Sequence, residues 1–114
     1  MGCANNNAFK YISTTEDIII SIKEENMRIE DNLITSGLVF KTDTKSLDKI
    51  QRIRNFLKLS EELIDMIKNK TVKNPSYFGD LLYNCYKNIF DDSLNKSSIY
   101  IKRTYKYITR YPPK

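Results

Sequence analysis

The chain has 114 residues, 40% of them hydrophobic and 29% charged, which excludes both a disordered chain and one large enough for two cores. Its 19 Lys/Arg and 14 Asp/Glu give a formal net charge of +5. The apolar run Ile18–Ile20 is much shorter than the ~20 residues of a membrane-spanning helix, and no apolar run in the chain is longer. Because no signal peptide is visible in the first ten residues, we predict a cytoplasmic protein, with peripheral membrane association left open.

The first predicted elements are a polar arm and a long helix. Residues 1–13 are rich in asparagine and predict a flexible arm. Thr14 and Asp17 match the capping box that starts a helix, and Gly37 is a typical terminator, so a helix is expected from about Thr15 to Ser36. Apolar residues recur along it at helical spacing: Ile18, Ile22, Ile29 and Ile34.

An α+β alternative with a short N-terminal hairpin stays open, because residues 18–22 and 38–40 are rich in β-branched and aromatic side chains. From Ser46 onward the pattern is clearly helical. Its apolar positions share one face: Leu47, Ile50, Ile53 and Leu57. The segment Ser60–Glu62 could either cap a new helix or continue the same one with a bend.

The C-terminal part predicts two more helices. Pro75 suits the first turn of a helix, and it is followed by an apolar stripe made of Phe78, Leu81, Leu82, Cys85 and Ile89. A final helix over residues 97–111 places Ile101, Tyr105 and Ile108 on one side and is ended by Pro112 and Pro113. The predicted fold is an all-α bundle of about four helices in one domain, residues 14–111, with 112–114 as a tail.

Most catalytic designs lack their residues in this chain. There is no histidine, the two cysteines stand 82 positions apart, and three scattered glycines cannot build a phosphate-binding loop. The run from Asp91 to Lys102 resembles a calcium loop, but its sixth and twelfth positions are Lys96 and Lys102 instead of glycine and glutamate. We therefore predict no enzyme, no cofactor and no metal site.

Acidic side chains also gather on one helix face of the segment that follows Ser60. Glu61, Glu62 and Asp65 have lysines within reach at positions 58 and 68, which favours a solvated charged face with ion pairs.

Charge is distributed unevenly along the chain. Residues 67–114 contain ten Lys/Arg against three Asp/Glu, and no acidic residue follows Asp92. A surface of one sign attracts oppositely charged partners, so the predicted partner-binding residues lie in this part: Tyr100, Lys102, Arg103, Lys106, Tyr107, Arg110 and Tyr111. Tyrosines alternating with cations suit single-stranded nucleic acid, a membrane interface or a protein hot spot, and also a core stripe with soluble cations around it.

The N-terminal Met1-Gly2-Cys3 resembles the start of proteins that are myristoylated on glycine and palmitoylated on the next cysteine. Position 6 is Asn6, where that pattern has serine or threonine. The resemblance implies Gly2 and Cys3 as possible lipidation sites.

Short matches between residues 60 and 110 carry a family resemblance. Residues 72–77 (Val-Lys-Asn-Pro-Ser-Tyr), residues 80–82 (Asp-Leu-Leu), Lys87, Ile89, Arg103 and the pair Tyr107-Ile108 are similar to the central helices of small bacteriocin immunity proteins. That resemblance implies a basic, cytoplasmic, antiparallel four-helix bundle that protects a producing cell near its membrane receptor, without catalysis.

These observations predict a small non-enzymatic helical binding protein, of immunity or inhibitor type, that binds a protein or membrane-associated partner. Two alternatives are a small nucleic-acid-binding or phage-type inhibitor protein that uses the basic tyrosine-rich segment, and a lipid-anchored membrane adaptor.

Overall fold

The computed structural model describes residues 8–87, 89–90, 99–104 and 106. Its elements in chain order are α1 (Thr15–Thr35), the short 3-10 helix η1 (Leu38–Phe40), α2 (Thr44–Ile67) and α3 (Pro75–Tyr86). Residues 99–104 and 106 are also helical and are called the last helix below. No strand occurs within these ranges, so the predicted all-α bundle of about four helices is confirmed and the hairpin alternative is wrong.

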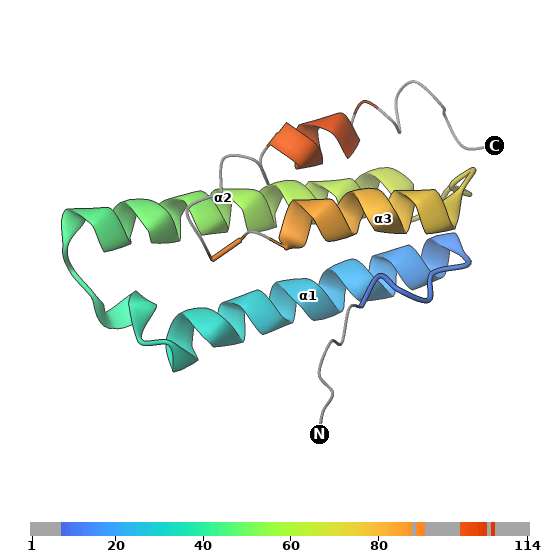
Figure 1. The fold of residues 1–114 in the computed structure, drawn as a ribbon. Helices are drawn as coiled ribbons and strands as arrows, with labels where there is room; N and C mark the ends of the chain where they lie inside the picture. The colour runs from blue at the N-terminus through green and yellow to red at the C-terminus, as the bar shows by residue number, and fades with distance from the viewer. Residues whose placement is uncertain (1–7, 88, 91–98, 105, 107–114) are drawn as a thin grey trace.

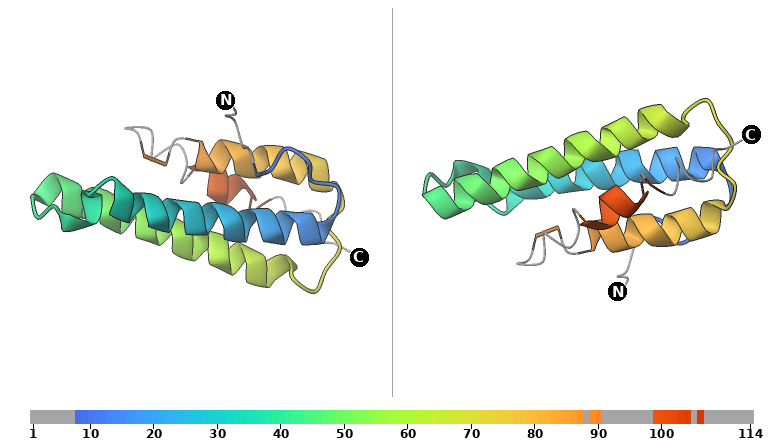
Figure 2. Two further views of the ribbon diagram at one scale, coloured as in Figure 1. Left: turned by 90° about the horizontal axis from the view of Figure 1, so that it is seen from below. Right: turned by 90° about the horizontal axis from the view of Figure 1, so that it is seen from above.

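The helices pack as a bundle in which α1 and the last helix lie on opposite sides. Helix α1 contacts both α2 and α3, and α2 runs antiparallel to both (Figure 1). The last helix covers α2 and α3 from the side away from α1, as the two views of Figure 2 agree. The core lies between these four elements.

Local side-chain hydrogen bonds explain where the helices begin. Thr14 accepts the amide of Asp17 at 3.0 Å, and the Asp17 carboxylate accepts the backbone amides of Ser13 and Thr14, which completes the predicted capping box. These bonds, chiefly that from Ser13, lower the pKa of Asp17. Asp43 caps α2 in the same way and accepts both the amide and the hydroxyl of Ser46, and the hydroxyl bond is the main reason that its pKa is lowered.

The helix boundaries follow the sequence closely, and one open question is resolved. Helix α1 ends at Thr35, and Gly37 adopts the left-handed φ of 78° that favours glycine. Helix α3 begins at Pro75 as expected. Helix α2 is a single element through Ser60, whose buried hydroxyl donates to the backbone oxygen of Leu57 at 2.8 Å instead of capping a new helix.

Residues 8–13 do not form a polar arm. Phe9 and Ile12 are buried in the core, and the Ser21 hydroxyl donates to the backbone oxygen of Ala8 at 2.7 Å. Gly79 of α3 makes room for them, since a Cβ there would stand 3.2 Å from the backbone oxygen of Phe9. The arm prediction was wrong for these six residues, because two apolar side chains in a polar stretch suffice to dock it.

Two predicted core positions are exposed. Ile34 near the end of α1 and Leu47 near the start of α2 have exposed fractions of 57% and 52%. Helix α3 has 12 residues against 21 in α1 and 24 in α2, so the far ends of the longer pair extend beyond it (Figure 1). The helical spacing was right, but the third helix that would cover these two side chains does not reach them.

Candidate functional sites: a cationic helix and an acidic groove

The last helix presents one buried face and one charged face. Ile101 and Thr104 are fully buried, and the Thr104 hydroxyl lies 3.6 Å from the thiol of Cys85 in α3. Lys102 and Arg103, in the same turn, are exposed. Buried positions three apart fix the rotation of the helix about its axis, so its cations are held outward by packing.

The predicted partner-binding residues divide into placed and unplaced ones. Tyr100 is half-buried against the core, and the Arg103 guanidinium lies over its ring at 5.5 Å from the centroid. Lys106 is exposed, like Lys102 and Arg103. The other predicted residues fall outside the described parts of the chain: Tyr107, Arg110, Tyr111 and the lipidation candidates Gly2 and Cys3.

Burial decides the chemistry of Cys85. Its thiol is fully buried, and the loss of solvation raises its pKa to about 12. A thiol in that state is a poor nucleophile and a poor metal ligand, so Cys85 acts as a small core side chain. Nor does any group of three or more His, Cys, Asp or Glu side chains gather to hold a metal within the described ranges.

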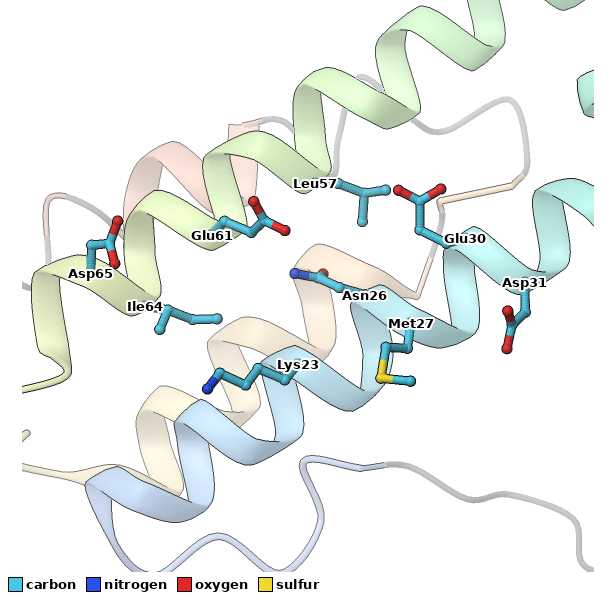
Figure 3. A pocket seen from close by; sticks show the side chains of 9 residues that line it. All are labelled: Lys23, Asn26, Met27, Glu30, Asp31, Leu57, Glu61, Ile64 and Asp65. Atoms are coloured by element: carbon cyan, nitrogen blue, oxygen red, sulfur yellow. The ribbon is translucent and has the colours of Figure 1, made fainter.

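A groove of about 570 Å³ lies between α1 and α2, and the sequence did not indicate it. Figure 3 shows the side chains that line it from both helices. Leu57 and Ile64 are its buried apolar members, and Met27 is exposed at 67%. Around them stand Glu30 and Asp31 of α1, Glu61 and Asp65 of α2, and a single lysine, Lys23. Four carboxylates against one ammonium group give the lining a formal charge of −3.

The floor of the groove is fixed by a buried polar network. Asn26 is only 8% exposed, and its side-chain oxygen accepts the Tyr86 hydroxyl at 2.5 Å. It also lies 3.0 Å from the Ser60 hydroxyl, whose one hydrogen is shared between Asn26 and the backbone oxygen of Leu57. Tyr86 also packs on Phe9 and edge-on against Phe56, at centroid distances of 5.3 and 5.0 Å. One amide oxygen thus joins α1, α2 and α3.

The acidic face predicted for α2 is only partly a solvated ion-pair surface. Asp65 pairs with Lys68 at 3.6 Å on an exposed face, as expected. Glu61 and Asp65 also line the groove, which the sequence could not indicate because it does not specify which face of α1 lies opposite them. The calcium-like run begins at Asp91, and its first eight residues lie outside the described ranges.

No protein-family model matches this chain, and no curated protein or solved structure is significantly similar to it. Within the described residues, no helix combines the length and the apolar character needed to cross a membrane.

Proposed function

We propose that the chain is a non-enzymatic helical binding protein of immunity or inhibitor type, which docks the cationic face of its last helix on an anionic surface of a protein partner. The observation that carries the proposal is the rigid division of that helix. Ile101 and Thr104 are buried while Lys102 and Arg103 are exposed, so the cations are presented on a packed scaffold. The resemblance to immunity proteins favours a partner associated with a membrane.

The position of Tyr100 favours a protein partner over single-stranded nucleic acid. Binding of unpaired bases relies on aromatic faces that are free to stack. Among the described residues of the last helix, Tyr100 is the one aromatic side chain, and it is half-buried with Arg103 over its ring. The cations in the described part of this helix therefore have no open aromatic face beside them, which suits charge complementarity with an acidic protein surface.

Photo-cross-linking in the native host cell tests this proposal. A photoreactive amino acid replaces Ile99, which is 51% exposed in the same helix, and a second chain carries it at Tyr11, which is 82% exposed. We expect a protein adduct on ultraviolet irradiation from position 99. It should be lost in the Lys102→Glu/Arg103→Glu variant and retained in the matched charge control Lys45→Glu/Lys73→Glu.

Two results would contradict the proposal. One is an adduct that resists both variants or forms equally from position 11, because the last helix would then not be the contact surface. The other is low-salt binding of a 20-nucleotide oligo-dT that the Lys102→Glu/Arg103→Glu variant abolishes, because phosphate neutralisation would then explain the cations.

A further inference from the structure

The acidic groove between α1 and α2 carries a second inference, about a site distinct from the last helix. We propose that it is a docking site for a cationic amphipathic helix of another polypeptide, whose apolar side chains pack on the floor and whose Lys/Arg side chains meet the carboxylates.

The unpartnered amide of Asn26 is the first argument for an occupant. The side-chain oxygen of Asn26 is fully used by Tyr86 and Ser60, which leaves the amide nitrogen as a donor. The hydrogen bonds of the Asn26 side chain within the described residues go to its oxygen, and Figure 3 shows the nitrogen pointing into the space between α1 and α2. Water can reach a nitrogen that points into an open groove, so a bound helix must supply a carbonyl or hydroxyl oxygen in its place.

Charge identifies the occupant as a cation. The groove lining has a formal charge of −3 on a chain whose net charge is +5, so its sign is opposite to that of the whole molecule. Glu30 and Glu61 face the groove from its two sides (Figure 3). Basic side chains placed between the two helices would meet carboxylates on either flank. A second copy of the chain is disfavoured, because two molecules of +5 repel each other at low salt.

The shape and composition of the floor indicate a helix. The lining residues span 23–31 on α1 and 57–65 on α2, each about 12 Å at 1.5 Å per residue, which is about two turns of a bound helix. Met27 is an adaptable apolar contact. Ile34, seven residues further on, lies on the same side of α1 and is also exposed, so it extends the apolar surface. This is the surface expected for recognition of an amphipathic helix in a groove.

Titration with two synthetic peptides tests the proposal on the full chain. The first is a 14-residue leucine/lysine peptide with leucines at helical spacing, and the second replaces every lysine by glutamate. We expect the lysine peptide to bind, measured by fluorescence anisotropy of a labelled peptide up to 1 mM protein, and the glutamate peptide not to bind. The Glu30→Gln/Glu61→Gln variant should weaken binding at least tenfold.

A charge-matched control separates the groove from general electrostatics. The Asp48→Asn/Asp80→Asn variant removes the same two charges at exposed positions outside the groove lining and should change the affinity less than twofold. Met27→Gln, which removes apolar contact without altering charge, should weaken binding several-fold. All five positions are exposed, and circular dichroism confirms that the variants fold.

Three outcomes would overturn the inference. The lysine peptide could fail to bind, or the two double variants could weaken it equally, which would reduce the effect to net charge. Sedimentation could instead reveal a dimer that Glu30→Gln/Glu61→Gln dissociates, which would make a second copy of the chain the occupant.

Discussion

The substitution Tyr86→Phe tests the buried network that holds the bundle together. It removes one hydroxyl and leaves the ring, so the packing on Phe9 and Phe56 is retained. The lost hydrogen bond to Asn26 is short and buried, but the Asn26 oxygen keeps its second donor in Ser60. We therefore expect only the net value of one neutral hydrogen bond, about 1 to 1.5 kcal/mol of unfolding free energy, and a Tm lower by about 4–6 °C.

A double-mutant cycle makes the test specific. Ser60→Ala removes the other donor, and the double variant leaves the buried Asn26 oxygen without either of its two hydrogen bonds. The combined loss should exceed the sum of the single losses by about 1 kcal/mol, because an orphaned buried acceptor costs more than a lost bond. Urea unfolding followed by circular dichroism measures the three values.

Tyr83→Phe provides the control, since Tyr83 lies on the same helix and is 43% exposed. It should change the free energy by less than about 0.5 kcal/mol. Additive losses in the cycle, or a Tyr83→Phe effect equal to that of Tyr86→Phe, would refute the account of the network.

Three further predictions concern α3. Gly79→Ala should destabilise the chain, although alanine in a helix usually gains ~1 kcal/mol over glycine, because the new Cβ would meet Ile12 at 2.9 Å and the backbone of Phe9 at 3.2 Å. Faster trypsin cleavage after Lys10 would show it, and a higher Tm would contradict it. In a Cys3→Ser background, Cys85 should react with a thiol reagent at pH 8 only in urea, because it is fully buried. Burial raises the pKa of Cys85 from 9.0 to about 12. Above pH 9 the thiol therefore ionises in the unfolded chain but not in the folded one, and the free energy of unfolding should fall by up to ~1.4 kcal/mol per pH unit. Urea unfolding at pH 8 and pH 10.5 should show that Cys85→Ala loses less unfolding free energy between the two pH values than the unsubstituted chain does. An equal loss in the two proteins would contradict this.

The sequence predicted those features of the fold that are determined by contacts between residues close together in the chain. Contacts within four residues fix the helix ends at the Thr14 capping box, Gly37 and Pro75. The isoleucine spacing in α1 predicts the buried face at Ile18, Ile22 and Ile29. The helix ends were confirmed because these local contacts do not depend on how the bundle closes, whereas Ile34 is exposed because its burial does.

Features that depend on distant segments were missed. Phe9 and Ile12 show no periodicity, and their burial depends on the absence of a side chain at Gly79, about seventy residues away. The groove likewise needs Glu30 and Glu61 on facing helices. Asn26 reads as an ordinary helix-surface residue until the hydroxyl of Tyr86, sixty positions later, is brought to it.

The two candidate surfaces have opposite charge and lie on different faces of the bundle. The groove opens between α1 and α2, and the last helix packs over α2 and α3 away from α1 (Figure 2). Each surface would repel the ligand of the other. A cationic helix is repelled by Lys102 and Arg103, and an anionic protein is repelled by Glu30 and Glu61. In a chain this small, separating charge across the bundle is a direct physical route to binding two different partners with little cross-reaction.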